Sequence, residues 1–267
     1  MLWKVLLIGI VEGITEWLPI SSTGHMLLLD QWIPLPMSED FKEMFFVVIQ
    51  LGAILAVLAE FWEKLWPCTT AEGRLHFRGE ALHLWYRIGV GCLPAGVLGL
   101  LLDDILEAHF GTPTTIAAML IVYGVLFIVV EHRSRTPIIH TTSALSFGTA
   151  FAIGLFQALA MIPGTSRSGA TIMGALLLGV SRTAASEFSF FLAIPTMLGA
   201  SALKLVKFGF AFRFDELCVL FVGMVTAFGV SLLSIRFLMN FTRRHSFTVF
   251  GWYRILLGIA VFYLHRA

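Results

Sequence analysis

The chain has 267 residues, of which 58% are hydrophobic and 13% charged, and its formal net charge is +1. A mean hydropathy of +0.87 excludes an ordinary soluble domain of this size and indicates a membrane protein with several spans. This net charge says nothing about partners, but the sequence has no basic block that would suggest nucleic acid, so we expect no nucleic-acid partner. The cysteines lack the spacing of a disulfide framework or a metal site, so we expect free thiols at Cys68, Cys92 and Cys218.

Two apolar stretches are interrupted, each by a proline that hydroxyl-bearing residues and glycines follow. Inside a bilayer such a break is tolerated only where protein or a water-filled cavity satisfies the freed backbone groups. The sequence therefore predicts an all-α polytopic membrane protein with six transmembrane helices and two re-entrant helical hairpins. In chain order, we expect a hairpin at 3–30, spans at about 43–62, 85–102 and 115–131, a hairpin at 144–180, and spans at about 187–207, 216–238 and 249–265.

The chain is expected to form one membrane domain, 1–267, built from two related halves at about 1–132 and 143–267. Each half holds one hairpin and three spans, and an odd number of spans gives the second half an inverted topology. Paired interrupted segments in an inverted repeat indicate a site near the membrane midplane, where the hairpins meet. The matching positions are Gly9 with Gly154, Glu12 with Gln157, Pro19 with Pro163, Ser22 with Ser166, Glu43 with Glu187, Gly91 with Gly223 and Ala95 with Ala227.

The orientation is predicted from the basic residues, which favour cytoplasmic loops. One side carries eleven of them: Lys64, Arg74, Arg78, Arg87, Arg133, Arg135, Arg182, Arg236, Arg243, Arg244 and Arg254. The other side carries six: Lys4, Lys42, Lys204, Lys207, Arg213 and Arg266. We therefore expect the first side to be cytoplasmic and both termini to lie outside.

The first hairpin contains the motif Glu12-Gly-Ile-Thr-Glu16-Trp-Leu-Pro19-Ile-Ser21-Ser22-Thr23-Gly24-His25. The two glutamates are four residues apart, so a helix presents both carboxylates on one face. Proline ends that helix, and the hydroxyl residues after it are typical N-caps of the next one. A helix start there directs backbone N–H groups toward the polar cluster. The alternatives are an interfacial helix with a wet face and, for His25, a buried core histidine.

The second hairpin contains Pro163-Gly164-Thr165-Ser166-Arg167-Ser168-Gly169-Ala170-Thr171. Hydroxyls, glycines, a helix N-terminus and the Arg167 guanidinium are what a phosphate-binding cradle needs. An ionisable residue inside a membrane segment is costly and indicates function. The alternative is a structural arginine bound to backbone carbonyls. Together with the carboxylates of the first hairpin, this pattern predicts a membrane-embedded hydrolase of lipid phosphates.

Both motifs resemble the signatures of the undecaprenyl-pyrophosphate phosphatase family associated with bacitracin resistance, and the resemblance covers essentially the whole chain. It implies an enzyme of the bacterial inner membrane that hydrolyses undecaprenyl pyrophosphate to undecaprenyl phosphate and inorganic phosphate. This reaction recycles the lipid carrier for peptidoglycan. It also implies the inverted-repeat fold and a site that opens outward. The partners implied are the lipid bilayer, undecaprenyl pyrophosphate and shorter prenyl pyrophosphates; a homodimer stays open.

The resemblance assigns the acidic pair to Glu12 and Glu16, and it implies help from a divalent cation, Mg²⁺ or Ca²⁺. Two carboxylates could hold such a cation only with phosphate and water as further ligands. The nucleophile stays open between His25, which we favour, Ser22, and a water activated by a glutamate. We expect Arg167 to bind the phosphates, together with Ser21, Thr23, Gly164, Thr165, Ser166, Ser168 and Thr171.

The main alternative function is transport, because inverted repeats with paired hairpins are a transporter architecture. The cargo would be a small anion or the lipid phosphate itself. A pure anion carrier has no need of two carboxylates beside its anion, so the pair Glu12 and Glu16 favours hydrolysis. A structural membrane protein would not need Arg167 at a hairpin tip.

Overall fold

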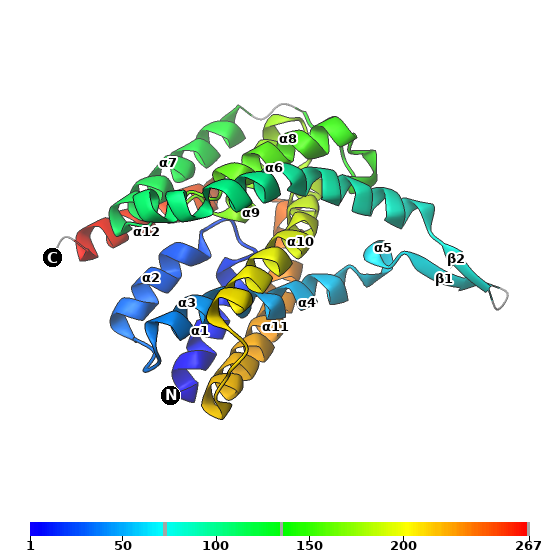
Figure 1. The fold of residues 1–267 in the computed structure, drawn as a ribbon. Coiled ribbons are helices and arrows are strands. Elements are labelled where there is room, and N and C mark those ends of the chain that lie inside the picture. The colour runs from blue at the N-terminus through cyan, green and yellow to red at the C-terminus, as the bar shows by residue number, and fades with distance from the viewer. Residues whose placement is uncertain (72–73, 134–135, 266–267) are drawn as a thin grey trace.

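The structure, a computed structural model, describes residues 1–71, 74–133 and 136–265. It is a bundle of helices from which one β-hairpin projects (Figure 1). The helices are α1 (Leu2–Thr15), α2 (Ser22–Trp32), α3 (Glu39–Val48), α4 (Gln50–Glu60), α5 (Trp62–Leu65), α6 (Gly79–Phe110), α7 (Pro113–His132), α8 (Phe147–Leu159), α9 (Arg167–Leu177), α10 (Arg182–Phe208), α11 (Phe214–Thr242) and α12 (Thr248–Leu264), with a 3₁₀ turn η1 (Thr142–Ala144).

Five helical segments in the described residues are long and apolar enough to cross a membrane. They are Glu39–Glu60, which comprises α3 and α4, then Gly79–Leu102, Pro113–His132, Arg182–Phe208 and Phe214–Thr242. The sixth predicted span, 249–265, corresponds to α12, whose 17 residues reach about 26 Å. Large apolar side chains such as Leu100, Phe221 and Leu256 are exposed, as expected for surfaces that face lipid. The prediction of an all-α polytopic membrane protein is confirmed.

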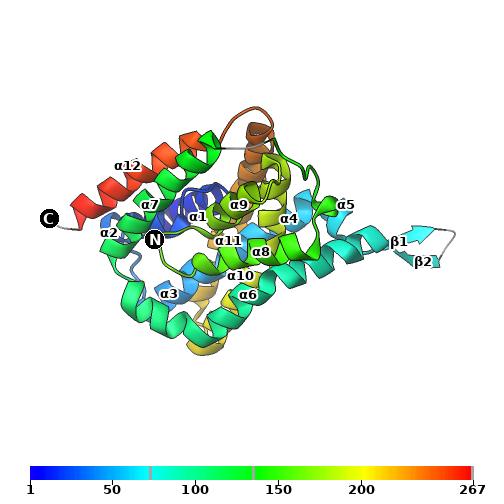
Figure 2. The same ribbon diagram turned by 90° about the horizontal axis from the view of Figure 1, so that it is seen from above.

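The described residues form two strands, β1 (Cys68–Ala71) and β2 (Arg74–Phe77), which pair antiparallel with Cys68 opposite Phe77. An isolated bridge also joins Ile139 and Val180. This β-hairpin was not predicted from the sequence. It follows the short helix α5 and projects away from the bundle in both views (Figures 1 and 2). It therefore lies apart from the helices that build the site.

The two interrupted stretches both form helical hairpins. α1 and α2 occupy the first, and α8 and α9 the second. Each hairpin packs mainly against a long helix of the opposite half: α1 lies on α11, and α8 lies on α6. Glycines make these approaches close, because a Cβ at Gly9 would lie 3.0 Å from the carbonyl oxygen of Gly223, and a Cβ at Gly154 would meet the backbone of Gly91. The two halves of the chain are thus interlocked.

Charged side chains gather at two ends of the bundle. At one end Lys64 binds the buried carboxylate of Glu187 at 2.8 Å, and at the other Lys204 lies 3.6 Å from Glu43. Glu43 and Glu187 are predicted to match between the two halves, and each contacts a lysine of the other half. A cavity of about 570 Å³ opens beside Glu187, and Arg243 also lines it. No residue of either hairpin lines this cavity, so it is separate from the hairpin tips.

The predicted count of basic residues on the cytoplasmic side is wrong for one residue. Arg254 was counted on the cytoplasmic side, but it is fully buried in α12 and binds carbonyls at the hairpin tips. Arg135 and Arg266 lie outside the described residues. Without Arg254 the count is ten against six, which leaves the predicted orientation unchanged.

The contact between α6 and α8 yields a prediction. Gly154→Ala should lower the free energy of unfolding by about 1–3 kcal/mol, because the new methyl group collides with the backbone of Gly91. The matched control is Gly96→Ala on α6, where a Cβ meets nothing within 4 Å. Thermal unfolding in detergent would show a lower Tm for Gly154→Ala alone. Equal Tm values would contradict the close packing.

Candidate active site

The two hairpins turn in the same way. α2 and α9 are preceded by the N-cap residues Ser21 and Ser166, whose φ angles are 72° and 71°. They are the two residues other than glycine with positive φ among the described residues. Each serine hydroxyl accepts a hydrogen bond from the N–H three residues ahead, at Gly24 and Gly169 respectively. Such backbone strain persists where the surrounding structure enforces it, often at functional sites.

This geometry corrects the register of the internal match. The sequence comparison matched Ser22 with Ser166, but the shared cap geometry matches Ser21 with Ser166. Ser22 and Arg167 therefore occupy the same position, the first residue of a hairpin helix. One hairpin presents a hydroxyl there and the other a guanidinium.

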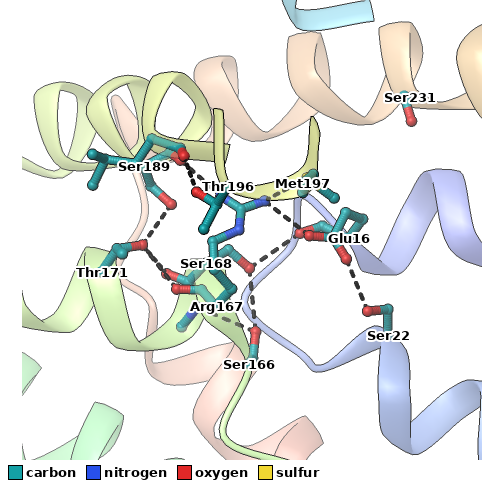
Figure 3. Close-up of polar contacts among 12 residues, drawn as sticks. Glu16, Ser22, Ser166, Arg167, Ser168, Thr171, Ser189, Thr196, Met197 and Ser231 are labelled. Atoms are coloured by element: carbon teal, nitrogen blue, oxygen red, sulfur yellow. Dashed lines mark hydrogen bonds and ion pairs between the residues drawn. The ribbon is translucent and has the colours of Figure 1, made fainter. Parts of the chain in front are cut away.

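The carboxylate of Glu16 joins these two residues (Figure 3). Its Oε1 accepts a hydrogen bond from Arg167 Nη2 at 2.8 Å, and its Oε2 accepts one from Ser22 Oγ at 2.9 Å. The carboxylate is 8% exposed and the arginine side chain 14%, so the ion pair is largely shielded from solvent. A serine hydroxyl that donates to a carboxylate is arranged for activation as a nucleophile.

Arg167 is held on several sides. Its Nη1 donates to the carbonyl of Ser189 on α10 at 2.7 Å, and its Cζ lies 5.6 Å from the ring centroid of Trp17. Its Nε is buried and has no hydrogen-bond partner. The guanidinium is therefore fixed in direction and keeps a donor for a further group. The bond to the Ser189 carbonyl is what a purely structural arginine would make. The ion pair with Glu16 is an additional contact that such a role does not require.

The hydroxyls of the second motif mostly connect the two hairpins. Ser168 Oγ lies 3.1 Å from the Glu16 carbonyl oxygen and 3.4 Å from that of Leu18, and it can donate to either. Thr171 Oγ1 lies 2.7 Å from Ser189 Oγ, and Thr165 is buried without a partner for its hydroxyl. These contacts fix the position of the second tip against the first.

The remaining residues that were expected to bind phosphate are spread over both tips. Ser21 and Ser166 are the N-caps, and Thr23 is exposed on the first turn of α2. Gly164 has a φ of 91°, and its carbonyl accepts a hydrogen bond from Arg254. Backbone N–H groups at a helix start have no partner within the helix, so both tips present donors suited to an anion.

Glu12 is buried beside Glu16 and Gln50, and its Oε1 has no hydrogen-bond partner. Arg167 compensates one of the two neighbouring carboxylates, which leaves the second to be balanced by a proton or a cation. Both oxygens of Glu16 accept hydrogen bonds, whereas Oε1 of Glu12 has no partner and is the freer of the two carboxylates to bind a cation. No group of three or more His, Cys, Asp or Glu that could hold a metal occurs in the described part of the chain.

His25 is not part of the cluster around Glu16. Its Nδ1 lies 2.7 Å from the carbonyl oxygen of Ser21, and its Nε2 lies 2.7 Å from the hydroxyl of Tyr253 on α12. Both ring nitrogens are thus engaged away from Ser22. This arrangement does not favour the histidine as the attacking group.

The helix α12 also contributes to the site, which the two sequence motifs did not predict. Arg254 is fully buried and donates to the carbonyls of Pro19 at 3.3 Å and of Gly164 and Thr165 at 2.8 Å each, so one guanidinium binds both hairpin tips. Its Cζ lies 5.7 Å from the ring centroid of Tyr123 on α7. An arginine inside the apolar run 249–265 was a signal in the sequence. In the orientation count this arginine was instead placed with the basic residues of the cytoplasmic side.

The sequence matches known proteins over almost its whole length. The family model described as "Bacitracin resistance protein BacA" matches residues 5–260. The chain belongs to the BacA family. A protein of Enterococcus faecalis named undecaprenyl-diphosphatase is 60% identical over 261 residues, which cover 97% of this chain and 95% of that protein. Proteins of the same name from Desulfitobacterium hafniense and Lachnoclostridium phytofermentans are 58% and 55% identical, each over 97% of this chain and 94% and 95% of their own length.

The part of this BacA protein that matches the family includes both hairpins and most of α12.

We expect Arg254→Met to destabilise this BacA protein by about 2–5 kcal/mol, because three buried carbonyls lose their donor. The control is Arg244→Met, which changes an exposed arginine beyond the end of α11 and should shift stability by less than about 0.5 kcal/mol. Thermal unfolding in detergent measures both. Equal Tm values for the two variants would argue against the bracing contact.

Proposed function

We propose that the protein hydrolyses undecaprenyl pyrophosphate to undecaprenyl phosphate and inorganic phosphate within the membrane. The observation that carries the proposal is the Glu16 carboxylate, which binds Ser22 of one hairpin and Arg167 of the other. A nucleophile, a base and a cationic phosphate ligand then lie within one cluster. The relatives named undecaprenyl-diphosphatase support the substrate.

In the proposed reaction, Ser22 Oγ attacks the terminal phosphorus and its proton passes to Glu16 Oε2. The bond between that phosphorus and the bridging oxygen breaks, and undecaprenyl phosphate leaves with the electron pair. Water then hydrolyses the phosphoserine, which releases inorganic phosphate and restores the hydroxyl. The Arg167 guanidinium and the N–H groups at the starts of α2 and α9 stabilise the charge on the transferring phosphoryl group.

Proton transfer and phosphate binding are coupled through Glu16. When the carboxylate takes the proton of Ser22, it loses the charge that holds Arg167 Nη2. The guanidinium is then free to bind the phosphoryl oxygens more strongly as the reaction proceeds. An interaction that strengthens in the transition state lowers the barrier.

The transporter alternative has less support. A carrier that binds an anion at Arg167 would gain nothing from a serine hydroxyl and a carboxylate beside it, since the carboxylate repels the anion. Hydrolysis uses all three groups.

For the location, we propose the bacterial inner membrane, with both termini and the opening of the site on the outer side. The ten basic residues on the side of Lys64 against six on the other support this orientation. Shorter prenyl pyrophosphates are proposed as additional substrates, because the groups that bind phosphate do not depend on the length of the lipid.

The test is phosphate release from farnesyl and undecaprenyl pyrophosphate by the purified protein in detergent. Ser22→Ala and Glu16→Gln should each lower kcat by about 10³-fold or more, and Arg167→Ala by a similar factor. Ser143→Ala, an exposed serine outside the hairpins, is the control and should keep full activity. Wild-type release that survives Ser22→Ala would refute the nucleophile, and no release at all would favour transport.

We also propose that a divalent cation assists the reaction. Glu12 would hold it through Oε1, and phosphate and water oxygens would complete its shell. Such a cation would supply positive charge near the phosphates. We expect a chelator to lower wild-type activity and Mg²⁺ or Ca²⁺ to restore it, and Glu12→Gln to raise the cation concentration at half-activation about tenfold or more. Glu63→Gln, at an exposed position on α5, is the control. Full activity after chelation would contradict the proposal.

A further inference from the structure

Tyr253 on α12 contacts the first hairpin from outside the two motifs. Its hydroxyl lies 2.7 Å from His25 Nε2, and the two rings are nearly parallel, with an interplanar angle of 7° and centroids 5.6 Å apart. Tyr253 is the neighbour of Arg254, which braces both tips. Two consecutive residues of α12 therefore contact the hairpin tips, Tyr253 through the His25 side chain and Arg254 through backbone carbonyls.

The direction of the hydrogen bonds follows from the chemistry of the partners. The carbonyl oxygen of Ser21 can only accept, so His25 Nδ1 must carry the proton of the 2.7 Å contact between them. In the neutral ring Nε2 is then an acceptor, and the hydroxyl of Tyr253 donates to it. The result is a relay from a phenol through an imidazole to a backbone carbonyl.

The contact at Nε2 distinguishes His25 from other histidines of the chain. His109, His132, His245 and His265 also place Nδ1 near the carbonyl oxygen four residues earlier. Among the described histidines, only His25 also has a side-chain hydrogen bond at Nε2. Nδ1 contacts of this kind are therefore a local feature of helices, and at His25 the hydroxyl of Tyr253 adds a hydrogen bond at Nε2 that stabilises the Nδ1–H tautomer.

The carbonyl at the end of the relay belongs to the strained residue of the first tip. Ser21 has a φ of 72°, and its carbonyl is in the same peptide group as the N–H of Ser22. At the second tip Arg254 binds two carbonyls at 2.8 Å, whereas at the first it reaches only Pro19, at 3.3 Å. Ala170 occupies the position equivalent to His25. The first tip thus has a brace that the second lacks.

We propose that Tyr253 is a positioning residue that acts through His25. Its hydroxyl donates to Nε2, which orients the imidazole and stabilises the Nδ1–H tautomer. The Nδ1–H group then holds the Ser21 carbonyl and therefore the peptide plane that leads into Ser22. His25 in this role orients the nucleophile and does not attack. The inference rests on the proposed function, in which Ser22 is the nucleophile.

Three variants separate positioning from chemistry. Asparagine places an amide nitrogen near the site of Nδ1, whereas glutamine places its amide near Nε2 and loses the bond to Ser21. We expect His25→Asn to keep kcat for phosphate release within about tenfold of wild type, and His25→Gln to lose about 10–100-fold. Tyr253→Phe should lower kcat about tenfold with KM unchanged, and should have no further effect in the His25→Asn background.

The control is Tyr263→Phe, a second exposed tyrosine of α12, which should leave kcat unchanged. A histidine that reacts covalently predicts a different pattern, in which His25→Asn and His25→Gln are equally inactive. That pattern would overturn the proposal, as would an effect of Tyr253→Phe that persists in the His25→Asn background.

NMR spectroscopy tests the relay independently of enzyme activity, because it detects the tautomer of His25. In the full-length protein with ¹⁵N-labelled histidine, the ring signals of His25 are those that His25→Asn removes. At neutral pH we expect the Nδ1–H tautomer in wild type and a shift toward Nε2–H in Tyr253→Phe. The Nε2–H tautomer in wild type would refute the relay. Should wild type release no phosphate, the proposed function fails, while this measurement still decides whether the relay exists.

Discussion

The ion pair between Glu16 and Arg167 is the contact on which the site depends. It joins two segments 151 residues apart in sequence and lies where water is largely excluded. A carboxylate or a guanidinium alone would be costly in such a place, whereas the pair compensates both charges and leaves Glu16 Oε2 for Ser22. The position of each hairpin is therefore tied to that of the other.

The two hairpin tips share one backbone geometry but have different roles. Both tips use a serine N-cap with positive φ and a glycine three residues later, so the two helix starts have the same geometry. The residue that follows the cap differs, and this difference assigns the hydroxyl to one tip and the guanidinium to the other. Interlocking of α1 with α11 and of α8 with α6 holds the tips in place from opposite halves.

The helix α12 adds a constraint that neither hairpin supplies. Arg254 bridges carbonyls of both tips, and Tyr253 contacts His25 of the first. A backbone carbonyl outside regular helix structure needs a hydrogen-bond donor from the protein wherever water is excluded, as it is in the hydrocarbon region of a membrane. The buried arginine supplies such donors, so the breaks that expose the site are stabilised by a helix distant in sequence.

The sequence by itself determined the class of the protein, the apolar segments and the two motifs that supply Glu16, Ser22 and Arg167. Hydropathy and the helix breaks at proline, serine and glycine depend on residues that are neighbours in the sequence, so they can be predicted without knowing the fold. Only the tertiary structure decided that Ser21 matches Ser166, that His25 binds Tyr253 and that Arg254 lies at the tips. His25 and Tyr253 are 228 positions apart in the sequence, and Pro19 and Arg254 are 235 positions apart. No local pattern encodes which distant helix packs on a hairpin, because that choice depends on how all the apolar surfaces are buried together.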